Sequence, residues 1–168
     1  MTVPTATVRP AVRADLADIA VIYGHYALHS DATFDEAPRP LADWELKFED
    51  VADRELPFLV AEEAGRVVGF AYAGPWRPKP AYRNTVEDTV YLAPDATGRG
   101  LGAALLAEVL AGCARAGVRQ VIAVITAPGS EASDALHRRL GFTEAGRLTA
   151  VGHKHGRWLD TVLLQRAL

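Results

Sequence analysis

The chain has 168 residues, of which 49% are hydrophobic and 23% are charged, and its formal net charge is −3 at pH 7. This length and composition indicate one globular domain rather than a disordered chain. The acidic balance argues against a nucleic-acid binder, because such proteins need a basic surface.

The first half of the chain is predicted to form a strand, two helices and a hairpin. Leu16, Ile19 and Tyr23 recur at helical spacing after Asp15, a plausible N-cap residue. Gly65 suits the positive φ of a hairpin turn. The expected bounds are a strand at 7–13, helices at 15–29 and 40–54, and strands at 57–62 and 67–73.

The second half is expected to hold one strand-helix-strand unit, a short helix and a final pair of strands. Val118–Ile125 is a β-rich apolar run, typical of a buried strand. The element order predicts an α/β fold, with a mixed and mostly antiparallel sheet flanked by helices. Residues 1–7 are expected to be a flexible tail and residues 8–168 a single domain. The bounds are strands at 85–92, 118–125, 143–151 and 158–165, and helices at 101–116 and 130–140.

Cys113 is the only cysteine, so no disulfide can form within the chain. The N-terminal segment lacks the apolar stretch of a signal peptide. No segment approaches the roughly 18 consecutive apolar residues of a membrane span. We therefore expect a cytoplasmic protein with no membrane partner and no nucleic-acid partner.

The sharpest local motif is the glycine-rich turn Thr97–Gly102, which reads TGRGLG and joins a strand to a helix. A helix N-terminus offers unpaired N–H groups and the positive end of the helix dipole. Glycines let the backbone come close to a ligand. The turn therefore predicts a phosphate-binding site, although a glycine-containing connection without a ligand is the alternative.

Matches spread along the chain accompany this turn, and together they resemble the GCN5-related N-acetyltransferase (GNAT) superfamily. Within it, the chain from about Val8 to Arg166 is similar to the phosphinothricin and methionine sulfone (sulfoximine) acetyltransferases. Thr97 stands where the superfamily's pyrophosphate loop usually has Gln or Arg. The matching segments are Thr33–Asp35, Gly74–Pro78, Tyr82–Arg83, Thr85–Tyr91, Ala132–Phe142 and Val151–Asp160.

The resemblance implies that acetyl-CoA is the co-substrate. It also implies a splayed pair of strands, Val86–Leu92 and Val118–Ile125, between which the pantetheine arm lies like an added strand. A backbone N–H near Tyr91 or Leu92 is expected to polarise the thioester carbonyl. The predicted cofactor-binding residues are Val90, Tyr91, Leu92, Arg99, Gly100, Leu101, Gly102, Ala103, Ser130 and Ser133.

The resemblance also suggests catalytic roles for Glu87 and His137. An amine arrives as an ammonium, so a carboxylate such as Glu87 can take its proton directly or through water. Asp88 is a competitor, although adjacent strand residues point to opposite faces. His137 is the candidate proton donor for the departing thiolate, and a structural hydrogen bond is its alternative.

Four side chains are candidates to bind the acceptor alongside Glu87. Arg77, Arg83 and Lys154 suit an acidic group on the acceptor, and Phe34 suits a wall of the acceptor site. Solvated surface charge and ordinary core packing are the alternatives. His153 and His155 are too few for a metal site without nearby partners, so we expect no metal.

The sequence therefore predicts an enzyme that acetylates the amino group of a small amino-acid-like acceptor by direct attack in a ternary complex. Phosphinothricin, methionine sulfone and methionine sulfoximine are the expected acceptors, which implies a link to herbicide resistance. The family also suggests a homodimer. An acetyltransferase for peptide N-termini or polyamines remains an alternative, as does a non-catalytic acyl-CoA-binding regulatory module.

Overall fold

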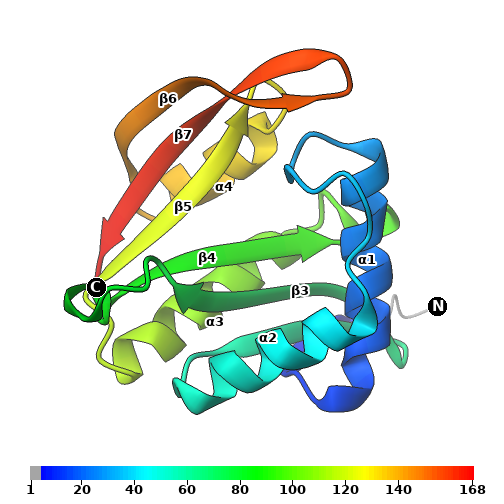
Figure 1. Ribbon diagram of the computed structural model, residues 1–168. Helices are drawn as coiled ribbons and strands as arrows, with labels where there is room; N and C mark the ends of the chain where they lie inside the picture. Colours follow the sequence, from blue (N-terminus) through cyan, green and yellow to red (C-terminus); the bar gives the residue numbers. More distant parts are fainter. Residues whose placement is uncertain (1–4) are drawn as a thin grey trace.

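A computed structural model describes residues 5–168 as four α-helices around one seven-stranded sheet (Figure 1). Residues 1–4 of the predicted tail lie outside this range, and the first strand already begins at Thr7. The helices are α1 (Leu16–His29), α2 (Leu41–Asp53), α3 (Leu101–Arg115) and α4 (Glu131–Arg139). The strands are β1 (Thr7–Pro10), β2 (Phe58–Glu63), β3 (Arg66–Pro75), β4 (Thr85–Leu92), β5 (Gln120–Ala127), β6 (Thr143–Lys154) and β7 (Arg157–Ala167).

The sheet has the strand order β1-β2-β3-β4-β5-β7-β6. Only β4 and β5 run parallel, and every other neighbouring pair is antiparallel. Helices α1 and α2 cover one face of the β1–β4 part, and α3 covers its other face, while α4 packs on β5 (Figure 1). The predicted mixed, mostly antiparallel α/β fold is therefore confirmed.

Most of the core lies between the helices and the β1–β4 part of the sheet, and it continues to β5 and β7 through residues such as Val121 and Leu164. Strand β3 is buried along almost its whole length because helices cover both of its faces. On the α1–α2 face, the rings of Trp44 and Phe70 meet edge to face with centroids 5.5 Å apart. On the opposite face, Leu105 and Val109 of α3 are completely buried. No helix among residues 5–168 is long and apolar enough to span a bilayer.

The hairpin turn between β2 and β3 follows the sequence prediction, since Gly65 adopts a φ of 77°. The predicted helices and strands all occur, with bounds that differ by a few residues. The largest shifts of a single end are three residues, since β1 stops at Pro10 rather than at position 13 and β6 continues to Lys154 rather than stopping at Val151. Strand β5 is displaced by two residues, to Gln120–Ala127.

Candidate active site

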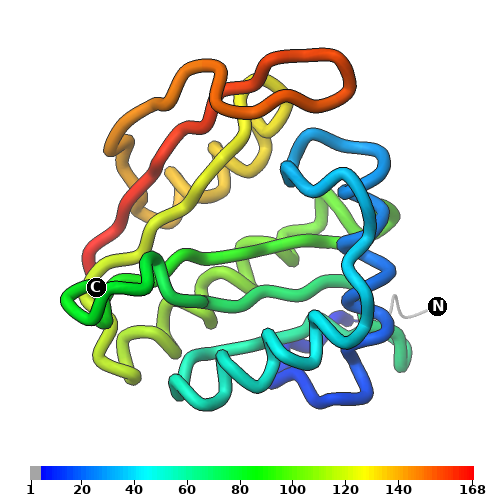
Figure 2. The backbone as a smooth tube through the Cα atoms, in the orientation of Figure 1, coloured from blue at the N-terminus to red at the C-terminus, as the bar shows by residue number. Residues whose placement is uncertain are grey.

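Strands β4 and β5 form an open wedge in the middle of the sheet. They pair only at Thr85–Glu87 of β4 and Gln120–Ile122 of β5. Beyond these positions β4 stays with β3 and β5 stays with β7, so the two strands diverge (Figure 2). The splay that the resemblance predicts is therefore present, and two strand edges without ladder partners face each other across it.

The glycine-rich turn lies at the open end of the wedge, where β4 ends and α3 begins. Gly98 has a φ of 75°, and Gly100, the residue before α3, has a φ of 80°. An added Cβ at either glycine would meet no atom within 4 Å. The left-handed backbone, rather than crowding, is therefore what requires glycine here, and the exposed turn leaves room for a ligand at the N-terminus of α3.

The predicted cofactor-binding residues gather around this open end. Strand β4 contributes three of these residues, all of which lie beyond its last position paired with β5. In this part of β4, the Leu92 carbonyl accepts a hydrogen bond from Tyr26 Oη at 2.5 Å. The Arg99 guanidinium is paired with Glu63 at 2.8 Å. Helix α4 follows β5 and contributes two serines. The members of the set are Val90, Tyr91 and Leu92 on β4, Arg99–Ala103 at the turn and α3, and Ser130 and Ser133 at the start of α4.

Glu87 lies at the closed end of the wedge, at the last β4 position that pairs with β5. Burial raises the pKa of Glu87, the neighbouring Asp88 charge raises it further, and Lys47 and Arg77 oppose both effects. A half-buried carboxylate with a raised pKa is suited to take a proton from an ammonium. Its role as the base stays a prediction from the resemblance.

Asp88 points to the opposite face, as the alternation of a strand requires. Its Oδ2 lies 2.8 Å from His137 Nε2, and both side chains are almost completely buried. The other ring nitrogen, Nδ1, lies 2.7 Å from the carbonyl oxygen of Ser133. An acid role for His137 therefore stays a prediction, and it requires that one of these hydrogen bonds be given up.

The predicted acceptor-binding cations do not converge on one point. Arg77 is exposed, with its guanidinium 4.9 Å from the centre of the Trp76 ring, and its charge acts on Glu87. Arg83 is exposed and donates to the Pro80 carbonyl at 3.2 Å. Of these two, Arg77 is the one whose charge lowers the pKa of Glu87.

Lys154 is placed differently from its predicted role. It is 2% exposed, and its ammonium donates to the Thr33 carbonyl at 2.8 Å and approaches the Tyr26 carbonyl at 3.5 Å. Burial lowers the pKa of Lys154. These contacts join β6 to the segment after α1, so the lysine holds the loop that carries Phe34 rather than presenting its charge to a ligand.

We expect Lys154→Met to lower the free energy of unfolding by about 1–3 kcal/mol, because the Thr33 carbonyl loses its buried donor. Urea unfolding measures this change. Lys79→Met removes an exposed lysine and serves as the control. Equal stability of both variants and the wild type would contradict the anchoring role.

Sequence reasoning missed a cluster on the α1–α2 face of β4. The guanidinium of Arg39 lies 4.9 Å from the Tyr23 ring centre, and its Nε donates to Asp35 at 2.7 Å. Lys47 of α2 lies 5.8 Å from the Tyr72 ring centre and acts on Glu87. Asp35 belongs to a recognised segment, but no pattern in the sequence links Arg39 or Lys47 to β4.

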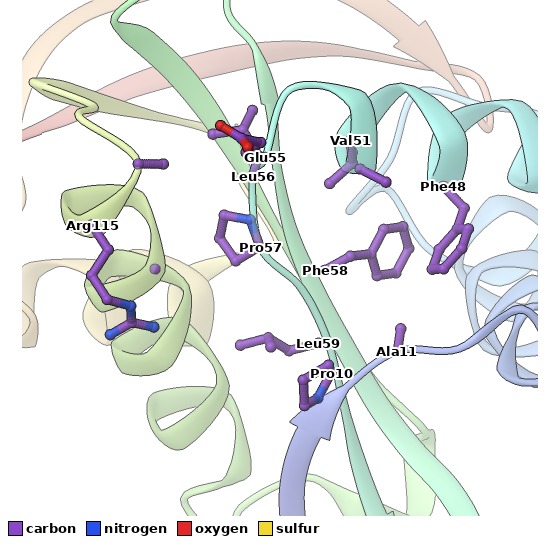
Figure 3. Close-up of a pocket in the computed structure, with 13 residues that line it drawn as sticks. Pro10, Ala11, Phe48, Val51, Glu55, Leu56, Pro57, Phe58, Leu59 and Arg115 are labelled. Atoms are coloured by element: carbon purple, nitrogen blue, oxygen red, sulfur yellow. The ribbon is translucent and has the colours of Figure 1, made fainter.

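A cavity of about 480 Å³ lies away from the wedge, between the ends of α2 and α3 and the start of β2 (Figure 3). Its lining is mainly apolar, with Phe48, Val51 and Phe58 along one side, and Glu55 and Arg115 are its charged residues. None of the predicted site residues lines it. The cavity therefore lies apart from the wedge and from the residues that the sequence indicates.

Comparison with known proteins agrees with this geometry. Residues 22–142 match the model of the acetyltransferase (GNAT) family. A phosphinothricin N-acetyltransferase from Alcaligenes faecalis is 46% identical over 96% of this chain and 82% of its own length. An L-methionine sulfoximine/L-methionine sulfone acetyltransferase from Pseudomonas aeruginosa is 40% identical over 96% of this chain and 94% of its own length. The crystal structure of a phosphinothricin acetyltransferase from Sinorhizobium meliloti in complex with acetyl-CoA superposes with a TM-score of 0.92 at 47% identity, covering 98% of this chain and 89% of the other.

Proposed function

Because the chain belongs to the acetyltransferase (GNAT) family, we propose that it acetylates the amino group of a small amino-acid-like acceptor. Phosphinothricin, methionine sulfone and methionine sulfoximine are the proposed acceptors, since the relatives named for them match nearly the whole chain. Acetyl-CoA is the acetyl donor. The observation that carries the proposal is the wedge between β4 and β5, with a glycine-rich turn at its open end and a carboxylate at its closed end.

The residues of the turn and of β4 bind the co-substrate in this proposal. Backbone N–H groups around Gly100 and at the start of α3 bind the pyrophosphate, because the helix dipole favours negative charge there. The β4 edge from Val90 to Leu92, where the Leu92 carbonyl already accepts from Tyr26, binds the pantetheine arm as a strand would. Bound acetyl-CoA supplies an activated acyl group as a thioester.

Glu87 acts as the general base of the reaction. It accepts a proton from the acceptor's ammonium, so that a neutral nitrogen faces the thioester carbonyl. A thiolate has a conjugate-acid pKa of about 8.5, so its departure demands little assistance. The cations Lys47 and Arg77 close to Glu87 disfavour a polyamine and favour an acceptor that carries an acidic or strongly polar group.

We expect Arg77→Ala to raise the acceptor KM about tenfold, equivalent to about 1.4 kcal/mol of lost binding, and to leave the KM for acetyl-CoA unchanged. Steady-state kinetics with each substrate varied in turn measures the acceptor KM and the acetyl-CoA KM separately. Arg83→Ala is expected to act in the same direction, since its guanidinium suits an acidic group. If neither variant raises the acceptor KM, the assignment of an acidic acceptor group to these arginines is wrong.

Phe34 is the proposed wall of the acceptor site, and Gly152 of β6 lies directly against it. A Cβ added at Gly152 would meet Phe34 Cε2 and Cζ at 2.4 Å, so Gly152→Ala must move the ring. We expect the acceptor KM to rise about tenfold, or about 1.4 kcal/mol. Gly146→Ala on the same strand is the control, because an added Cβ there meets nothing within 4 Å. Equal kinetics of the two variants would contradict the wall.

The direct test is CoA release from acetyl-CoA with a panel of acceptors. The panel holds phosphinothricin, methionine sulfone, methionine sulfoximine, common amino acids, a polyamine and a short peptide. We expect the first three to turn over fastest. Binding of acetyl-CoA without turnover on any acceptor would favour a regulatory module, and preference for the peptide or polyamine would replace the acceptor class.

Three family expectations remain. The first is a homodimer, the second is a cytoplasmic location, and the third is a contribution to resistance against phosphinothricin. Light scattering on the purified protein tests the first of these. Growth of cells that express the protein on phosphinothricin tests the third.

A further inference from the structure

A contact between two buried side chains, Asp88 and His137, bridges the wedge at the point where β4 and β5 begin to diverge. Asp88 is the first β4 residue beyond the last position paired with β5. Its Oδ2 lies 2.8 Å from Nε2 of His137, which belongs to α4 and therefore to the β5 side of the wedge. The side chains of Asp88 and His137 are 1% and 5% exposed.

The hydrogen-bond partners fix the protonation state of His137. The Ser133 carbonyl can only accept, so Nδ1, 2.7 Å away, carries a hydrogen. Nε2 faces a carboxylate, which accepts a hydrogen bond when the ring carries its second hydrogen, and Asp88 raises the pKa of the ring. In this arrangement both ring nitrogens donate, which makes the ring an imidazolium.

We propose that Asp88 and His137 form a permanent buried ion pair that ties α4 to the β4 arm and thereby sets the opening of the wedge. Both are positioning residues for acetyl-CoA, which rests on the function proposed above. His137 does not give up a proton during the reaction, because losing either one would leave a bare ring nitrogen facing Asp88 or the Ser133 carbonyl. Such a mismatch inside the protein is costly.

Other buried and charged groups surround the pair. Among residues 5–168, His137 is the only group that hydrogen-bonds the Asp88 carboxylate, since Oδ1 is buried and without a partner. Burial opposes the charged form of His137, but the hydrogen bond and charge of Asp88 outweigh it and raise the pKa of the ring. The other titratable groups acting on the pair are Asp134 on α4, Cys113 on α3 and Glu87 on β4.

The first test is nuclear magnetic resonance of the histidine rings in ¹⁵N-labelled protein, with His137 assigned by its loss in His137→Gln. Both ring nitrogens of His137 are expected to stay protonated as the pH rises well past the ordinary titration range. In Asp88→Asn the ring is expected to lose a proton at a lower pH. A neutral ring at pH 7 in the wild type would overturn the ion pair, whatever the enzyme's activity.

The second test is a double-mutant cycle read by thermal unfolding. His137→Gln leaves the Asp88 charge buried without a cation, so the melting temperature is expected to fall. Adding Asp88→Asn to that variant is expected to raise it again, because the stranded charge is removed. A further fall in the double variant would overturn the pair. Asp50→Asn, which breaks the exposed pair with Arg54, is the control and is expected to change little.

Kinetics separates positioning from proton donation. Asp88→Asn is expected to raise the KM for acetyl-CoA about tenfold while the pH profile of kcat keeps its shape. A fall in kcat with an unchanged KM and an altered alkaline limb would show that His137 is the acid and would overturn the proposal. If the wild type acetylates no acceptor, the proposed function fails, while calorimetric binding of acetyl-CoA and the two tests above still decide the ion pair.

Discussion

Glu87→Gln is expected to lower kcat by about 10²–10⁴-fold, the contribution typical of a general base. The substitution keeps the size of the side chain and removes its ability to take a proton from the acceptor's ammonium. The affinity for acetyl-CoA is expected to stay nearly unchanged, because the residue lies at the closed end of the wedge, away from the glycine-rich turn. Stopped-flow or steady-state turnover, combined with calorimetry for acetyl-CoA, measures both quantities.

The pH dependence of kcat/KM is a second test of Glu87 as the general base. The base works only when deprotonated, and burial together with Asp88 raises the pKa of Glu87. The acid limb of kcat/KM should therefore lie above the ordinary glutamate value, and activity should fall as the pH drops through it. Glu87→Gln should lose this limb. Glu108→Gln, on the exposed side of α3, is the control and should keep both the turnover rate and the acid limb of the pH profile. Unchanged turnover in Glu87→Gln would show that Glu87 is not the base.

Gly100→Val is expected to weaken acetyl-CoA binding about tenfold or more, equivalent to about 1.4 kcal/mol or above. Gly100 has a φ of 80° immediately before α3. A β-branched residue in this region is strained by about 1–3 kcal/mol, so the turn is expected to relax and its N–H groups to leave the positions that suit a pyrophosphate. Isothermal titration calorimetry with acetyl-CoA measures the loss.

Gly65→Val is a matched control for this substitution. Gly65 has a φ of 77°, and an added Cβ would meet nothing within 4 Å, as at Gly100. Both variants should therefore lose similar stability, but only Gly100→Val should lose acetyl-CoA affinity. If both bind acetyl-CoA as the wild type does, the turn is a connection and not a phosphate site.

Much of the fold could be predicted because its elements carry local signals. Helical spacing marked α1, the position of Gly65 marked the β2–β3 turn, and strand β4 was predicted with its bounds of Thr85 and Leu92. Alternation along β4 also separated Glu87 from Asp88, since neighbouring side chains of a strand point to opposite faces.

The site depended on contacts that no local pattern encodes. Asp88 and His137 are 49 positions apart, and Lys154 meets a carbonyl 121 positions earlier. The sequence predicts that Lys154 is a cation, but only the packing of β6 against the segment after α1 shows that its charge is buried. The nearness of Lys47 to Glu87 likewise follows from where α2 packs on the sheet and not from its residue pattern.

The wedge has a consequence for how this protein avoids aggregation. A strand edge without a ladder partner is a template on which another chain can add and start an aggregate. The outer edges of this sheet are protected, because β1 is only four residues long and β6 is interrupted by a register shift between Leu148 and Gly152. A further stretch of unpaired strand backbone lies inside the molecule, where β4 and β5 face each other at an angle. Because β4 and β5 diverge, an added chain cannot pair with both strands along their length, so the wedge is a poor template for aggregation.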